Sequence, residues 1–375
     1  MYKIALVMDQ QVGLRTQALN FEHVVRRDAS IDATWVPVRY EMDAGLLTRL
    51  PGLPSGLKGS LRGVSEIRHG LGDARRFDAV LWATWAAKSV PDLVAAAPSF
   101  LVMDMTPVQM EAMGAHYGYT SSRARFLGGW KRRATERLYR QATSFFPWNE
   151  WVAASLRKDY GISPEKITPL SPGVNVDLYH SDAAAKPKDG VVRLLFVGGD
   201  FQRKGGDLLL RWARETRVAA PWELHIVTRD PVSAVPQVVV HRNLSNNSPE
   251  LIGLYQQSDL FVLPTRADCY SLVAMEAMAS GLPVIISRLG GIPEIVIEGE
   301  TGHLIGVDDY AALTAHLERL ILDSSLRQRL GTASRHRACT DFDCSTNVEQ
   351  ILEAMKAGSR RSAMETARFN DVGAK

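Results

Sequence analysis

Residues 193–210, RLLFVGGDFQRKGGDLLL, predict a strand, a glycine-rich loop and a helix in direct succession. The continuous apolar run at residues 194–197 is typical of a strand that is buried on both faces. Glycine lets backbone N–H groups approach a ligand closely, and a helix N-terminus attracts anions. With the cations of Arg203 and Lys204 beside them, these features predict a phosphate-binding loop. A solvated turn that carries two surface cations is the competing interpretation.

The same alternation of short apolar runs and helix-like segments extends along the chain in both directions. The predicted strands lie at residues 3–8, 79–82, 100–103, 193–197, 224–227, 238–240, 260–263 and 283–286. The predicted helices lie at residues 16–24, 207–214, 249–257, 272–279 and 310–322. Buried strands that alternate with helices predict an α/β fold with open, mostly parallel sheets. Because the pattern restarts after the breaker-rich residues 186–190, we predict two Rossmann-like domains, residues 1–178 and 190–344.

Composition excludes several classes of protein. The 375 residues suit about two domains, and 46% hydrophobic against 23% charged residues exclude a mostly disordered chain. A net charge of +3 does not indicate nucleic acid, and no apolar run reaches the ~18 residues that span a bilayer. The first apolar run stops at Asp9, too early for a secretory signal peptide. The three cysteines, Cys269, Cys339 and Cys344, cannot build a disulfide framework, so we expect a cytoplasmic protein.

A second motif lies at residues 268–284, DCYSLVAMEAMASGLPV. Glu276 is the only charged residue between Asp268 and Arg288, so it lies in an apolar helix, where a carboxylate needs a hydrogen-bond partner. A vicinal diol such as a ribose would supply two donors. Asp268 lies in the preceding loop, where unpaired backbone N–H groups of the helix also lie. The alternative is a core helix whose one glutamate is bonded to protein groups.

This run of two carboxylates with seven residues between them resembles the signature of the retaining GT-B glycosyltransferases of family four. Other segments resemble the family in the same order: residues 159–161, 171–175, 203–204, 290–296 and 299–302. The resemblance covers residues 155–345 well and residues 1–150 weakly. It implies a GT-B fold with two Rossmann-like domains, and a C-terminal helix at residues 345–358 that packs back on the first domain. The small, polar residues 357–375 predict a frayed tail.

The resemblance also implies an activity. A glycosyl group would pass with retention, and without a divalent metal or another cofactor, from a UDP- or GDP-sugar to an acceptor hydroxyl. The sequence does not identify that acceptor, which could be a glycan, a lipid-linked compound or a small molecule. Glu276 would accept the ribose hydroxyls, and Lys204 with Arg203 would hold the diphosphate and the leaving group. The remaining donor-binding positions that the resemblance implies are Gly13, Gly199, Asp268, Tyr270, Ser271, Leu272 and Val273.

The chain departs from the family pattern at several positions. The first carboxylate is Asp268 where the family has glutamate, and Gly199 stands where an arginine is frequent. Asp104 follows a predicted strand where many members present a histidine, so it is our candidate to orient the acceptor hydroxyl; a strand-end cap is the alternative. His116 and Tyr117 are lesser candidates. The pair Asp341 and Asp343 is interpreted as surface, not as a metal motif.

Residues 123–140 form a predicted helix with seven basic residues and several large apolar ones. Such a helix suits contact with an anionic membrane at the inner face, but also a solvated face packed on the sheet. Nucleic acid is not expected as a partner. Two rival functions stay open: a sugar-nucleotide epimerase or hydrolase, and a sugar-nucleotide-binding subunit without catalysis. A nicotinamide dehydrogenase is disfavoured, because no G-x-G-x-x-G follows the first strand of either domain.

Overall fold

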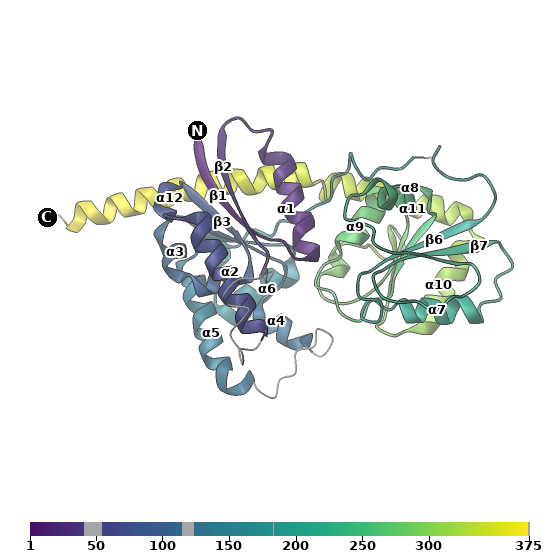
Figure 1. The fold of residues 1–375 in the computed structure, drawn as a ribbon. Coiled ribbons are helices and arrows are strands. Elements are labelled where there is room, and N and C mark those ends of the chain that lie inside the picture. The colour runs from purple at the N-terminus through teal and green to yellow at the C-terminus, as the bar shows by residue number, and fades with distance from the viewer. Residues whose placement is uncertain (41–54, 115–123, 183, 374–375) are drawn as a thin grey trace. The chain divides into compact units, whose positions relative to one another are not determined.

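The computed structural model describes residues 1–40, 55–114, 124–182 and 184–373. The chain divides into two compact units, each built around its own sheet (Figure 1). The first unit holds Met1–Glu111, Thr120–Pro172 and Ser345–Lys375, and the second holds Gly173–Cys344 together with Ala112–Tyr119. Residues 173–178, which we expected in the first domain, therefore belong to the second unit.

The sheet of the first unit has five parallel strands in the order β2-β1-β3-β4-β5. The strands are β1 (Tyr2–Asp9), β2 (Ile31–Val38), β3 (Ala79–Ala83), β4 (Ser99–Met103) and β5 (Ser144–Pro147). The central strand β3 is buried along its whole length, as its continuous apolar sequence predicts. The edge strand β2 has buried residues mixed with exposed ones, because part of its surface faces solvent.

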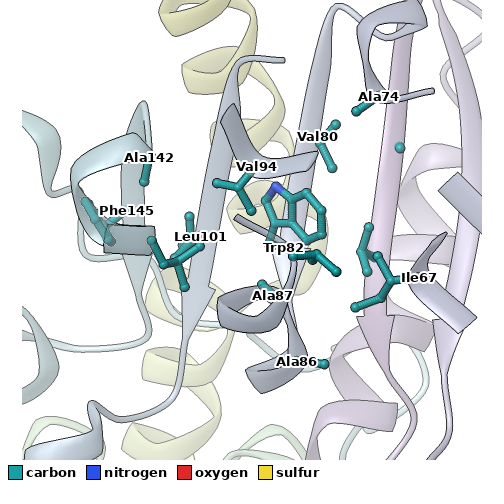
Figure 2. Packing of buried hydrophobic residues seen from close by; sticks show 14 of the residues in the cluster. Ile67, Ala74, Val80, Trp82, Ala86, Ala87, Val94, Leu101, Ala142 and Phe145 are labelled. Carbon is teal, nitrogen blue, oxygen red and sulfur yellow. The ribbon is translucent and has the colours of Figure 1, made fainter. Parts of the chain in front are cut away.

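Helices cover this sheet and enclose a hydrophobic core. They are α1 (Val12–Val25), α2 (Ser55–Leu71), α3 (Pro91–Ala96), α4 (Pro107–Ala112), α5 (Ala124–Gln141), α6 (Glu150–Tyr160) and α12 (Cys344–Gly373). Trp82, Val94 and Leu101 lie in the core (Figure 2). The indole of Trp82 donates a hydrogen bond of 3.0 Å to the buried hydroxyl of Ser99, so the one polar atom of this large ring is satisfied.

Helix α12 closes one side of the first unit. The hydroxyls of Tyr2 and Ser359 are 2.8 Å apart, and a Cβ added to Gly358 would lie 2.8 Å from the ring of Phe100. The expectation of a frayed tail after residue 357 is wrong, because α12 continues to Gly373. Proline is absent from these residues, and the good helix formers alanine and arginine are frequent, which favours continuation of the helix.

The second unit has six parallel strands in the order β11-β10-β9-β6-β7-β8. The strands are β6 (Val192–Val197), β7 (Trp222–Val227), β8 (Val238–His241), β9 (Leu260–Leu263), β10 (Val284–Ser287) and β11 (Gly302–Ile305). The helices are α7 (Gly206–Glu215), α8 (Pro249–Gln257), α9 (Leu272–Ala279), α10 (Tyr310–Leu322) and α11 (Ser324–Asp341). This is a doubly wound sheet of the Rossmann type.

The chain enters and leaves the second unit at neighbouring points. The backbone N–H of Val174 donates to the carbonyl of Phe342 at 2.7 Å, and the N–H of Cys344 donates to the carbonyl of Val174 at 3.0 Å. Phe342 is buried, Asp343 is half-buried and Asp341 is exposed, so our surface interpretation of residues 341–343 holds only in part. Among the described residues, no helix is long and apolar enough to cross a membrane.

Candidate active site

The strand order of the second unit reverses between β6 and β9, which are neighbours although β7 and β8 come between them in the sequence. In open α/β sheets, ligands bind beyond the carboxyl ends of the strands at such a point. Two loops leave the sheet here: residues 198–205 between β6 and α7, and residues 264–271 between β9 and α9. These loops hold most of the residues that the sequence analysis selected.

The glycines before α7 serve close packing rather than ligand approach. Gly205 has φ +77°, and a Cβ there would lie 2.0 Å from the carbonyl oxygen of Pro264. The N–H groups of Gly205 and Gly206 donate to the carbonyls of Gln202 and Phe201. Our expectation that these amides face a ligand is therefore not met. Gly199 differs, because it is exposed and a Cβ there would meet no atom within 4 Å.

The two cations of the loop both contact the β9–α9 loop. Nη1 of Arg203 donates to the carbonyl of Ala267 at 2.7 Å, and its Nε donates to Asp200 at 3.0 Å. Nζ of Lys204 donates to Oδ2 of Asp268 at 2.5 Å. The two residues that we assigned to the diphosphate and to the sugar are therefore joined directly.

The ion pair between Lys204 and Asp268 is well shielded from solvent. The side chains are 14% and 9% exposed, so the pair is far from a surface salt bridge. Removing one member of such a pair leaves an uncompensated charge in a poorly solvated place, which is costly. An anionic ligand at this point would give the ammonium a second partner.

A buried hydroxyl without a protein partner lies at the N-terminus of α9. Ser271 precedes the helix and is 1% exposed, and its Oγ has no hydrogen-bond partner within the described part of the chain. The backbone around it is held by a neighbouring loop: Gly291 N–H donates to the carbonyl of Cys269 at 2.9 Å. Since buried hydroxyls are usually satisfied, this one suits a ligand with an acceptor or donor group. Tyr270 is also buried, whereas Leu272 and Val273 are the first two residues of α9.

Glu276 has one protein partner. It lies in α9 with 4% of its surface exposed, and its Oε2 accepts a hydrogen bond of 2.8 Å from the hydroxyl of Tyr255 in α8. Within the described ranges this is the only hydrogen bond to the carboxylate. This contact agrees in part with the alternative interpretation, in which the glutamate is bonded to protein groups. Because it involves Oε2 alone, Oε1 can accept a hydrogen bond from another donor.

A pair of tyrosines, Tyr255 and Tyr179, lies on one side of this carboxylate. Burial raises the pKa of Glu276 to about 7, and the Tyr255 hydrogen bond opposes that shift. The Tyr179 ring packs edge-on against Tyr255, with 5.4 Å between centroids, and its hydroxyl donates to Asn247 at 2.9 Å. Burial and the nearby Glu276 together raise the pKa of both tyrosines above the usual value. Side chains with strongly shifted pKa values, close to the loop that precedes α9, favour a binding site here.

The other candidates lie in the first unit. Gly13 is in the first turn of α1, exposed, and a Cβ there would meet no atom within 4 Å. Asp104 follows β4, is half-buried, and lines a pocket with residues that follow β3. His116 and Tyr117 lie outside the described residues, as does Arg123. Of the basic residues at 123–140, Arg132 pairs with Glu136, and Arg133, Arg137 and Arg140 are exposed.

Sequence reasoning missed Tyr255. The residue lies in a predicted helix as one apolar position among several, and nothing in its spacing distinguishes it from a core residue. It also missed the contact between Lys204 and Asp268, because 64 residues separate them. Strand order brings them together, and the order of strands in a sheet is not visible in local patterns.

Comparison with known proteins identifies the second unit most directly. Residues 192–323 match the family described as Glycosyl transferases group 1. An MMP alpha-(1->4)-mannosyltransferase of Mycolicibacterium hassiacum is 29% identical over 241 residues, which cover 61% of this chain and 57% of that protein. A D-inositol 3-phosphate glycosyltransferase of Corynebacterium diphtheriae is 30% identical over 221 residues, 52% of each chain. This chain thus spans somewhat more than half the length of these relatives.

Solved structures share the fold at low sequence identity. Sucrose-phosphate synthase of Thermosynechococcus elongatus has a TM-score of 0.72 and 18% identity, with coverage of 95% of this chain and 99% of that one. Anabaena HepE, solved with UDP-glucose, has a TM-score of 0.68 and 16% identity, with 95% and 100% covered. The fold of this chain is therefore GT-B, and its residues 192–323 match the glycosyl transferases group 1.

Proposed function

We propose that this protein transfers a glycosyl group from a nucleoside-diphosphate sugar to an acceptor hydroxyl, with retention at the anomeric carbon and without a divalent metal. The observation that carries the proposal is the shielded Lys204–Asp268 pair, beside the N-terminus of α9 and the buried Glu276, at the reversal of strand order. A structure of the same fold, HepE, is described with UDP-glucose, which supports a donor of this chemistry.

Each residue of the site has a proposed role. Lys204, whose ammonium is held by Asp268, and Arg203 would stabilise the negative charge that builds on the leaving diphosphate. The Ser271 hydroxyl and the first amides of α9, at Leu272 and Val273, would bind phosphate or sugar oxygens.

Glu276 would bind the ribose. Oε1 would accept a hydroxyl, while Tyr255 holds Oε2 and so positions the carboxylate. The departing phosphate would take the proton of the acceptor hydroxyl, so the site needs positioning and charge stabilisation more than a strong base.

The proposal is tested with a panel of UDP- and GDP-sugars and a set of acceptor alcohols, with released nucleoside diphosphate and glycosylated product as readouts. We expect product only when donor and acceptor are both present. Conversion of donor alone to an epimer or a free sugar would support the rival epimerase or hydrolase. Tight donor binding without any product would support a non-catalytic subunit.

Lys204→Ala should lower turnover by at least ~100-fold, because removal of a group that stabilises developing charge costs that much in comparable sites. The matched control is Arg211→Ala, which removes a cation from the exposed surface of α7, where Arg211 pairs with Glu215. Turnover of the Lys204→Ala protein near that of the control would refute the assignment.

Activity should also survive EDTA, since Lys204 and Arg203 would take the role that Mg²⁺ has in other transferases. Loss of turnover in EDTA with recovery on addition of Mg²⁺ or Mn²⁺ would contradict this part of the proposal. Retention is checked separately, by proton NMR of the new anomeric bond in the first product formed.

A further inference from the structure

A pocket lies in the first unit at the carboxyl ends of β3 and β4, next to the point between β1 and β3 where the strand order reverses. Its walls come from the carboxyl ends of β3 and β4, from the residues that follow these strands, from α5 and from Leu14 in α1. The pocket is open to solvent on one side, and its volume is about 40 Å³. A single water needs roughly 10–15 Å³, so the pocket has room for a short run of carbon atoms.

The walls of the pocket are mainly apolar. Leu101, Met103, Met105 and Leu138 line it together with the rings of Trp82 and Tyr139. The polar atom of Trp82 is engaged by Ser99, as described above, so the ring offers the pocket apolar surface. Thr84 also lines the pocket, but its hydroxyl already accepts from the backbone N–H of Ala86 and is 2.7 Å from the hydroxyl of Tyr40.

Two charged side chains, Asp104 and Lys88, line the same pocket and are half-buried. Ligand sites typically combine an apolar lining with a few polar groups that orient the ligand, and this pocket has that composition. A purely polar ligand such as a free sugar would leave most of the apolar wall without a partner.

We propose that this pocket binds an apolar alkyl or aryl group of the acceptor, which places the acceptor hydroxyl on the Asp104 side. The proposal rests on the proposed function, and it adds the chemical class: the acceptor is an amphiphilic alcohol, not a simple sugar. Helix α5 supports this class of acceptor, because it combines a pocket wall with exposed cations. The pocket is lined by its residues Thr135, Leu138 and Tyr139. The exposed cations, at spacings of four and three, are Arg133, Arg137 and Arg140.

The first test uses the unmodified protein with methyl-labelled methionine and NMR. Hexyl β-glucoside, below its micellar concentration, should shift the resonances of Met103 and Met105, which line the pocket. The resonances of Met275 and Met278, which are buried in α9 of the second unit, are the internal control. Glucose should bind at least about tenfold more weakly than hexyl glucoside, because burial of each methylene contributes about 0.8 kcal/mol. Equal affinity for the two compounds, or unchanged Met103 and Met105, would overturn the proposal.

The second test fills the pocket. Ala83 ends β3, is 3% exposed and lines the pocket, so Ala83→Leu adds three carbons inside it. The preference for hexyl glucoside should disappear. The control, Ala95→Leu, adds the same atoms on the exposed face of α3 and should change nothing. If Ala83→Leu does not fold, Ala83→Val adds two carbons in a residue that strands favour, and should reduce the preference in part. A folded Ala83 variant with the full preference would refute the pocket.

A third measurement separates this proposal from the proposed function. Transfer to hexyl glucoside free in solution is compared with transfer to the same glycoside in anionic vesicles, which distinguishes a soluble acceptor from a membrane-borne one. Failure to bind or use any sugar nucleotide would refute the proposed function, while the methionine shifts would still report on the pocket. Equal transfer to glucose and hexyl glucoside by an active enzyme would refute only the pocket.

Discussion

At the scale of single residues, the two carboxylates of the site have opposite surroundings. Asp268 has a cation at 2.5 Å, whereas Glu276 is buried in an apolar helix and has a neutral phenol at 2.8 Å. The same type of substitution should therefore have different effects at the two positions.

Glu276→Gln should weaken the binding of free nucleoside diphosphate and of sugar nucleotide alike. One ribose hydroxyl would lose a charged acceptor, at a cost of ~1.5–3 kcal/mol, or roughly tenfold to more than a hundredfold. Asp268→Asn removes the partner of Lys204 without removing the ammonium, so it should not weaken nucleoside diphosphate, but should lower turnover or the added affinity for the sugar. Calorimetric titration of both variants with both ligands gives the four comparisons. The opposite pattern would mean that the roles are exchanged.

The stability of the ligand-free protein should depend on the ionisation of Glu276. Its pKa in the folded protein is about 7, above the ordinary value of 4.5, so between these pH values the folded state holds a proton that the unfolded state has released. The contribution is complete below about pH 4.5 and is lost as the pH rises to about 7. The free energy of unfolding should fall by about 3 kcal/mol across this range from this group alone.

Denaturant unfolding at pH 5, 6, 7 and 8 measures that slope, and Glu276→Gln should remove this part of it. Tyr255→Phe serves as the second variant, because loss of its hydrogen bond should raise the pKa further and extend the fall to higher pH. Slopes that coincide in all three proteins would contradict the raised pKa of Glu276.

At the scale of elements, the central parts of the second unit are predictable from sequence. The bounds that we predicted for α8, α9, α10 and β9 are those of the structure, because their apolar periodicity is continuous and their ends carry clear signals. The strands β2, β5 and β11 were missed. β2 mixes buried and exposed residues and contains Pro37, whereas β5 and β11 have four residues each, too few for a reliable period.

The candidate site was predictable in its residue types and not in its contacts. The loop with Lys204 and the helix with Glu276 each have a local signal: glycines beside cations, and one charge in an apolar helix. The partners Asp268 and Tyr255 come from other elements, and sheet order and helix packing bring them into contact. The role of Gly205 also depends on a distant residue, Pro264, so the chain around it could not reveal that role.

The loop before α7 gives a test of this packing. Gly205→Ala should destabilise the second unit by about 2–4 kcal/mol, because the left-handed backbone and a Cβ 2.0 Å from the Pro264 carbonyl both oppose a side chain. Gly199→Ala, six residues earlier in the same loop, meets open space and should leave stability nearly unchanged. Thermal unfolding of the two variants provides the comparison. Equal melting temperatures would show that the loop is not constrained as described.

At the scale of the whole molecule, the main segment of the second unit, Gly173–Cys344, is an insertion in the first. The chain leaves the first unit after Pro172 and returns at Ser345, and the backbone pairing of Val174 with residues 342–344 holds the two crossing points together. A unit with neighbouring ends and its own core can fold alone. The first unit, by contrast, is incomplete without α12.

Removal of residues after Cys344 should therefore affect the two units unequally. α12 buries Val348, Ile351, Leu352 and Met355, so their loss should sharply lower the stability of the first unit. The second unit should keep its melting transition and its affinity for nucleoside diphosphate. Calorimetry of the shortened and full-length proteins resolves the two transitions, and simultaneous loss of both would contradict the independence of the second unit.

The position of α12 after the second unit in the chain has a consequence for synthesis on the ribosome. Phe100, against which Gly358 packs, is made early, and the helix that covers it follows only after the whole second unit. At roughly 5–20 residues per second, this part of the nascent first unit waits about ten to fifty seconds for its cover. Throughout that interval its apolar surface is open to other chains. The nascent protein should therefore depend on chaperones during translation, and more so when translation of the second unit is slowed.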